Sequence, residues 1–136
     1  MLPTRSEVRQ RVIRVPAIAL HHVQVAIPRG EEDRARAFYG GVLGLIEIPK
    51  PANQRERGGL WYRVGALELH IGVEDDFRPA KKAHPALLVD DLAAVIALAE
   101  AAGHPSKPDA LVIEGYDRVF VSDPFGNRIE LLQRLG

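Results

Sequence analysis

The triplet Ile129-Glu130-Leu131 near the end of the chain matches an earlier triplet, Leu67-Glu68-Leu69. A histidine precedes each glutamate by 46 positions: His22 precedes Glu68, and His84 precedes Glu130. The order of expected strands and helices around the two pairs is also the same, so the chain contains two copies of one unit in register. We therefore expect a duplicated fold.

The first unit is predicted to be a strand, a helix and three further strands. A strand over 18–27 alternates apolar and polar residues, and Pro28-Arg29-Gly30 ends it. Three acids, Glu31-Glu32-Asp33, favour the start of a helix, and Gly40-Gly41 loosens its end. Short strands are expected at 45–48, 60–64 and 67–73, where proline and glycine separate the apolar runs.

The second unit repeats this order after a charged, proline-containing linker over 75–83. It consists of a strand at 84–89, a helix from Asp90-Asp91 to about Ala102, and strands near 110–113, 118–122 and 128–132. Residues 123–127 form the turn between the last two strands. The sequence thus predicts one α+β domain over 18–136, with module one at 18–74 and module two at 84–133.

Residues 1–17 carry four arginines against one acid, Glu7, and are expected to form an arm outside the core. A solvated tail explains this composition more simply than an anionic partner does. Elsewhere charge gives no sign of nucleic acid or membrane partners, because 18 basic residues balance 18 acidic ones. The chain has no cysteine, which excludes disulfides and thiolate ligands and suits a cytoplasmic protein.

The repeated histidines and glutamates have the opposite strand parity to their apolar neighbours. Leu67, Leu69 and Ile71 alternate with Glu68 and His70, and Glu130 lies between Ile129 and Leu131 in the same way. One sheet face therefore packs on the helices, and the other carries the polar side chains. An ordinary solvated sheet surface would also have this pattern, but repeated ligand-type residues favour a site.

Imidazole nitrogen and carboxylate oxygen together suit first-row divalent cations such as zinc, nickel, cobalt, manganese and iron(II). The candidate metal ligands are His22, Glu68, His84 and Glu130, with His70 as an alternative to Glu68. The repeat favours Glu68, and the residue that does not ligate would still line the pocket.

In this order, several short motifs resemble the vicinal oxygen chelate superfamily of glyoxalases, bleomycin-resistance proteins and extradiol dioxygenases. The motifs are Leu20-His21-His22-Val23, Ala37-Phe38-Tyr39 with Val42-Leu43-Gly44-Leu45, Val89-Asp90-Asp91-Leu92, and residues 123–130. The resemblance covers nearly all of 18–133. It implies two βαβββ modules whose eight strands form a curved sheet around a cleft, with helices outside.

The resemblance also implies that His22, His84 and Glu130 occupy three ligand positions and Glu68 the fourth, as in glyoxalase I enzymes. A glutamate ligand of such a set, Glu68 or Glu130, can serve as the base in proton transfer. A homodimer is expected, with the site within one chain or across the interface. The expected activity is that of a metal-dependent lyase or isomerase acting on a small molecule with adjacent oxygens.

Two other functions remain open at this point. One is group transfer or hydrolysis of an antibiotic, for which arginines near the site could hold an anionic group: Arg63, Arg118 and Arg128, together with Tyr116. The other is metal-free binding of a drug or metabolite, for which all four ligand positions would not be needed. Secondary candidates are Trp61 and Tyr62 as cleft lining and Glu47 as an extra acid or base, whereas His21 is expected to pack in the core and His104 to lie at a helix end.

Overall fold

The computed structural model describes Leu2 and residues 16–136, so most of the predicted arm at 1–17 lies outside the described residues. The predicted α+β class and the duplicated βαβββ order are confirmed. Module one contains β1 (His22–Ile27), α2 (Glu32–Ala35), the π-helix η1 (Arg36–Val42), β2 (Ile46–Ile48), the 3-10 helix η2 (Ala52–Arg57), β3 (Leu60–Val64) and β4 (Leu67–Val73). Module two contains β5 (Ala86–Leu88), α3 (Leu92–Ala101), β6 (Lys107–Pro108), β7 (Tyr116–Ser122) and β8 (Arg128–Arg134).

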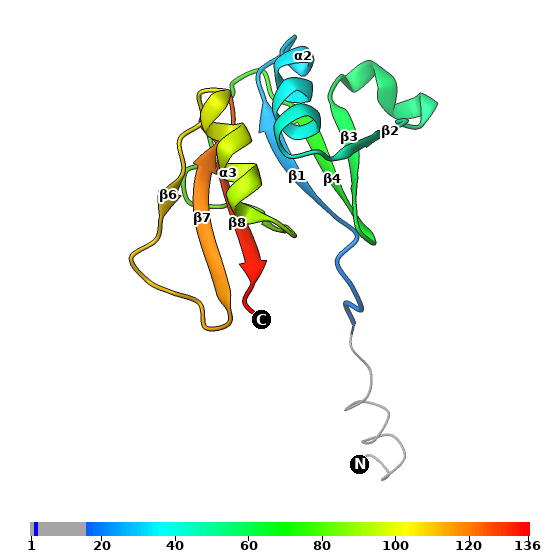
Figure 1. Cartoon of the computed structure of the whole chain (residues 1–136). Helices are drawn as coiled ribbons and strands as arrows, with labels where there is room; N and C mark the ends of the chain where they lie inside the picture. The colour runs from blue at the N-terminus through cyan, green and yellow to red at the C-terminus, as the bar shows by residue number, and fades with distance from the viewer. Residues whose placement is uncertain (1, 3–15) are drawn as a thin grey trace.

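Each module forms its own four-stranded mixed sheet. The strand orders are β1-β4-β3-β2 and β5-β8-β7-β6, and in both sheets the first and last strands of the module pair in parallel. Figure 1 shows the two sheets as separate units, each with its helical segment packed against it. Within residues 16–136 the eight strands do not join into one closed sheet, so the single curved sheet implied by the resemblance is replaced by two open sheets.

Strand parity explains which sheet face is buried. In β4, Leu69 and Ile71 are almost fully buried, and in β8 Ile129 and Leu131 are completely so. They pack with the helical side chains in one core, to which η1 contributes Phe38. Burying one such side chain contributes about 1.5–3 kcal/mol, which fixes the register and directs the residues of opposite parity to the other face.

A buried polar network joins the two modules at the turn over 123–127. The Tyr39 hydroxyl donates to Oδ2 of Asp123 at 2.7 Å, although the two residues are 84 positions apart. Asn127 donates from Nδ2 to the Ala26 carbonyl of β1 and to Asp123, both at 2.8 Å, and its Oδ1 accepts the Ala80 N–H of the linker. One turn of module two thus bonds directly to module one and to the linker, which satisfies polar groups that are costly to bury unpaired.

Two strands are shorter than predicted: the strand expected over 18–27 is His22–Ile27, and the one expected over 84–89 is Ala86–Leu88, which leaves His84 outside it. Two further elements differ more. The helix continues through Gly40-Gly41 to Val42 as a π-helix, with Leu43 N bonded to Phe38 O at 2.9 Å, because Phe38, Tyr39 and Val42 keep their side chains in the core. The expected strand at 110–113 is a loop, and β6 lies earlier, at Lys107–Pro108. Leu111 and Val112 are 75% and 87% exposed, so apolar composition without burial did not produce a strand.

Candidate functional site

The histidine and glutamate of module one lie side by side on the sheet face that points away from the helices. Because β1 and β4 are parallel neighbours, His22 is the Cα partner of Glu68. His70 follows on the same face of β4, and its Nε2 lies 2.9 Å from Oε1 of Glu68. The structure thus brings His22, Glu68 and His70 together, with both module-one alternatives in contact.

Three rings form a stack in this half of the site. The His70 ring lies 4.0 Å from the Trp61 ring, with 2° between their planes, and 4.0 Å from the His22 ring on its other side, with 18° between them. Trp61 is the Cα partner of His70 across β3 and β4. The stack buries His70 to 5% exposure and holds its ring edge toward Glu68.

A cavity of about 460 Å³ adjoins this stack. Besides His22, His70 and Trp61, it is lined by the cations Lys50 and Arg57. Its size lies in the range typical of small-molecule sites.

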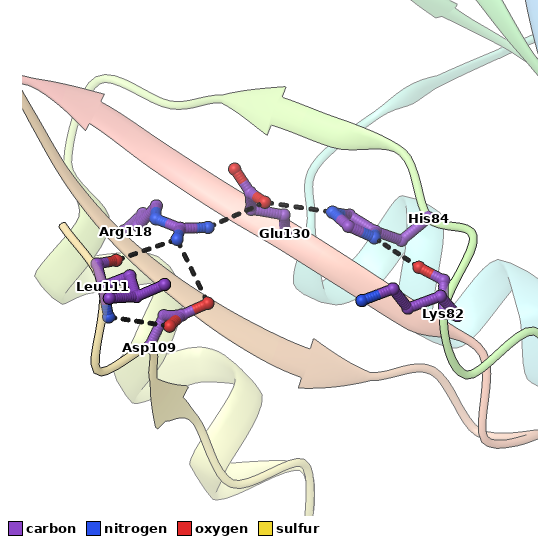
Figure 2. Close-up of polar contacts among 6 residues, drawn as sticks. All are labelled: Lys82, His84, Asp109, Leu111, Arg118 and Glu130. Carbon is purple, nitrogen blue, oxygen red and sulfur yellow. Dashed lines mark hydrogen bonds and ion pairs between the residues drawn. The ribbon is translucent and has the colours of Figure 1, made fainter. Parts of the chain in front are cut away.

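The pair in module two has a different environment. Nε2 of His84, which lies two residues before β5, is 3.0 Å from Oε1 of Glu130 on β8. Arg118 of β7 donates from Nη1 to the same oxygen at 3.2 Å. Figure 2 shows His84 and Arg118 approaching Glu130 from opposite sides. Glu130 is only 6% exposed, so its carboxylate is held among fixed partners.

The other nitrogen of His84 indicates which atom is available to a ligand. Nδ1 lies 2.8 Å from the Lys82 carbonyl oxygen, which can only accept a hydrogen bond. Nδ1 therefore donates to this carbonyl, which leaves Nε2, the nitrogen on the Glu130 side, as the atom available to a ligand. A backbone carbonyl on the second ring nitrogen is the usual arrangement of a metal-ligating histidine.

Local electrostatics favour the ligand forms of the module-one residues. Desolvation of the ring, followed by the neighbouring imidazoles of His70 and His21, lowers the pKa of His22 below 6.5. The hydrogen bond from His70 lowers the pKa of Glu68 below 4.5. At neutral pH His22 is consequently neutral and Glu68 ionised, as coordination to a cation requires.

The two pairs do not converge within a single chain. Among the described residues, no three His, Asp or Glu side chains form a group that could hold a metal ion. The ligand candidates instead form two half-sites, which we define as half-site one (His22, Glu68, His70) and half-site two (His84, Glu130). Each belongs to a different sheet.

Most of the secondary candidates have other environments. Glu47 pairs with Arg36 at 2.9 Å and is the Cα partner of the buried Tyr62, so it lies on the helix side of the sheet. His21 was expected to pack in the core, but it is exposed, because it precedes β1 and its Nδ1 contacts Nδ1 of His22 at 2.9 Å. His104 does lie at a helix end, where its N–H caps α3 by donating to Ala99 O at 2.8 Å.

The four residues proposed for an anionic group are similarly dispersed. Arg63 reaches Glu68 only at 4.0 Å, and Tyr116 lies at the far end of β7, opposite Arg134. The Arg128 guanidinium is centred 3.6 Å from the Phe120 ring, and both line a cleft of about 780 Å³ with Lys107. Arg118 alone contacts a ligand candidate at hydrogen-bond distance.

Sequence reasoning did not find two features of the site. The contact between Arg118 and Glu130 is diagonal, because Leu132 is the direct partner of Arg118 across β7 and β8, and no repeated residue in module one indicates it. The stacking of Trp61 on His70 depends on the strand register, although alternation did place Trp61 and His70 in neighbouring strands.

Comparison with solved structures identifies the family. A glyoxalase family protein from Bacillus anthracis is 44% identical, with a TM-score of 0.83, over 90% of this chain and 100% of its own. The chain belongs to the glyoxalase family. It is accordingly a member of the vicinal oxygen chelate superfamily. No family model matches this glyoxalase-family chain, and no curated protein matches it.

More distant structures share the fold of this glyoxalase-family protein. A glyoxalase/dioxygenase from Nostoc punctiforme is 17% identical, with a TM-score of 0.71, over 100% of this chain and 98% of its own. The fosfomycin resistance protein FosX from Listeria monocytogenes is 16% identical, with a TM-score of 0.68, over 88% of this chain and 95% of its own.

None of the described helices has the length and hydrophobicity needed to cross a membrane.

The donor set fits a divalent cation. His84 and Glu130 lie within 3.0 Å of each other, and His22 and Glu68 are direct partners on neighbouring strands, so each half-site brings one imidazole beside one carboxylate. Mixed imidazole and carboxylate donors also suit first-row ions better than calcium or magnesium. Each half-site supplies too few donors alone, and together they supply the predicted set of two imidazoles and two carboxylates.

Proposed function

We propose that this protein is a divalent-metal-dependent lyase or isomerase that acts on a small molecule with adjacent oxygens. We further propose that it works in the cytoplasm as a homodimer. In that dimer, half-site one of each subunit would face half-site two of its partner, so that His22, Glu68, His84 and Glu130 surround one ion. The observation that carries this proposal is the presence of two complementary half-sites on different sheets of one chain.

The exposure of the ligand faces supports pairing between chains. His22 and His84 are both exposed. Apolar side chains on the faces that carry the two half-sites are exposed with them. Ile46, which shares the face of Glu68, is 72% exposed, and Leu88, which shares that of Glu130, is 48% exposed. Covering such residues with a second copy would remove apolar area from water.

The residues of the half-sites have distinct tasks in this proposal. A bound divalent cation supplies a Lewis acid that polarises a substrate oxygen. Glu68 and Glu130 are the candidates to accept a proton from the adjacent carbon and to return it, as general acid–base catalysis requires. The stack of Trp61 on His70 forms one wall of the adjoining cavity, which Lys50 and Arg57 also line.

Metal analysis tests the site itself. Protein purified without chelators and titrated with zinc, nickel, cobalt, manganese or iron(II) should reach one ion per chain, and His84→Ala and His22→Ala should each abolish tight binding. His104→Ala is the matched control, because His104 is bonded to the Ser122 carbonyl away from both half-sites, and it should bind metal as the wild type does. Unchanged binding in His84→Ala would contradict the proposal.

Mixing two defective variants tests whether the site spans two chains. His22→Ala loses half-site one and Glu130→Ala loses half-site two, so neither homodimer should retain an intact site. After subunit exchange, a heterodimer would combine the intact half-site one of the second variant with the intact half-site two of the first. About a quarter of the wild-type metal sites should then reappear, whereas a site within one chain predicts no recovery.

Turnover is the last test of the proposed chemistry. The metal-loaded protein should accelerate proton transfer in small carbonyl compounds with an adjacent hydroxyl or carbonyl oxygen, and Glu130→Gln and Glu68→Gln should lower kcat. Product formation only from fosfomycin with water or a thiol would instead assign group transfer. Tight ligand binding that survives chelation would assign metal-free sequestration.

A further inference from the structure

Arg118 is bonded on both sides of its guanidinium. Nη1 donates to Oε1 of Glu130 at 3.2 Å, and Nη2 donates to the Leu111 carbonyl at 2.9 Å and lies 3.1 Å from Oδ2 of Asp109. The side chain is 13% exposed, and its centre lies 5.3 Å from the Phe120 ring. Figure 2 shows the chain of contacts from the Asp109–Leu111 loop through Arg118 to Glu130 and His84.

The loop end of this chain is itself fixed. Oδ1 of Asp109 accepts the Leu111 N–H at 2.8 Å, while its other oxygen faces Arg118. Asp109 therefore holds the loop backbone and the guanidinium at once. The same loop exposes Leu111 and Val112. Arg118 therefore links an exposed apolar loop to a ligand candidate through hydrogen bonds to both.

We infer that Arg118 is a positioning residue that fixes the Glu130 carboxylate for metal binding and couples it to the loop at 109–115. A forked guanidinium bonded to three acceptors defines an orientation, which a lysine at the same place would not define. This inference rests on the proposed metal site. It adds to that proposal a residue that does not itself ligate or touch the reacting atoms.

Arg63 in module one provides a comparison that distinguishes a positioning role of Arg118 from an effect of its charge alone. Arg63 also has a glutamate ligand candidate beside it, but the separation is 4.0 Å and the Arg63 side chain is 54% exposed. Its positive charge is therefore screened by water and it fixes no geometry. If Arg118 acted only through its charge, its removal would strengthen cation binding, because like charges repel. If it positions Glu130, its removal weakens binding.

Cobalt titration of four variants distinguishes these two roles. Arg118→Met and Arg118→Lys should both weaken Co²⁺ binding by about 10–100-fold, the usual effect of losing the partner of a metal ligand. Their cobalt absorption spectra should also change, because the coordination geometry changes. Arg63→Met and Arg63→Lys, the matched controls, should remain within about twofold. Wild-type affinity in Arg118→Lys, or tighter binding in Arg118→Met, would overturn the inference.

A measurement on metal-free protein keeps the two proposals separable. Side-chain NMR couplings should report one fixed χ1 rotamer for Glu130 in the wild type and averaging in Arg118→Lys, while thermal melting confirms that the variant is folded. A fixed rotamer in both proteins would overturn the positioning role whether or not metal binds. Failure of the wild type to bind any of the five metals, with Glu130 averaging in Arg118→Lys, would reject the metal site and retain the role of Arg118.

Discussion

The two modules repeat the same histidine and glutamate, yet they hold the glutamate in different ways. Glu130 is 6% exposed and bonded by both His84 and Arg118. Glu68 is more exposed, takes one close contact from His70, and has Arg63 only at 4.0 Å. Duplication thus preserved the donor atoms while the surroundings diverged, so one carboxylate is fixed by a charged partner and the other is left freer to move.

The largest effect on stability should come from the buried polar network at 123–127, which bonds the two modules to each other. Asn127→Ala removes side-chain bonds to Ala26, Ala80 and Asp123, and should lower the free energy of unfolding by about 3 kcal/mol because buried polar groups lose their partners. Urea denaturation measures this loss. Asn53→Ala, in an exposed position of η2, is the control and should differ little from the wild type. A loss below about 1 kcal/mol for Asn127→Ala would show that these hydrogen bonds contribute little to stability.

The next effect compares the two glutamates directly. Glu130→Gln removes the buried carboxylate that pairs with the Arg118 guanidinium. It should lower the free energy of unfolding of the metal-free protein by about 2 kcal/mol. Glu68→Gln should cost clearly less, because water can solvate that carboxylate and its histidine partner. Parallel urea denaturation curves measure both losses. Equal losses would show that the two glutamates are held equally strongly, contrary to the difference described above.

A smaller effect should appear in the titration of half-site one. Because desolvation of the ring and two neighbouring imidazoles lower the pKa of His22, its NMR titration midpoint should lie below 6.5 in metal-free protein. The unfolded chain then binds more protons, so this residue disfavours folding as the pH falls below 6.5. His70→Gln should move the midpoint upward, toward the ordinary value. A midpoint above 6.5 in the wild type would contradict the described environment.

The smallest effect should come from Asp109 in the loop of module two. The Leu111 N–H and then the nearby Arg118 lower the pKa of Asp109 below 3.8, so its contribution to stability is complete above 3.8 and is lost as the pH falls through the lowered value. Asp109→Asn should lower stability at neutral pH slightly and flatten the acid limb of the stability curve, because the amide lacks the charge whose contribution is lost in acid. An acid limb identical to that of the wild type would show that this carboxylate makes no folded-state bonds.

Regular alternation allowed much of the fold to be predicted and named the candidate residues of the site. The repeat of His22–Glu68 in His84–Glu130 predicted the modules, and strand parity predicted the buried faces that Leu69 and Leu131 occupy. Apolar composition misled at 110–113, where Leu111 and Val112 have nothing to pack against. Backbone periodicity is reliable only where one face of the strand is buried, because burial is what enforces it.

The sequence by itself determined which donor atoms the protein offers and which sheet face carries them, because side-chain direction along a strand follows from covalent geometry at a period of two. Only the tertiary structure decided which donors meet. It separated the set into two half-sites, joined Tyr39 to Asp123 and placed Arg118 on Glu130. Such contacts depend on strand register and on packing between segments far apart in the chain, which local patterns do not specify.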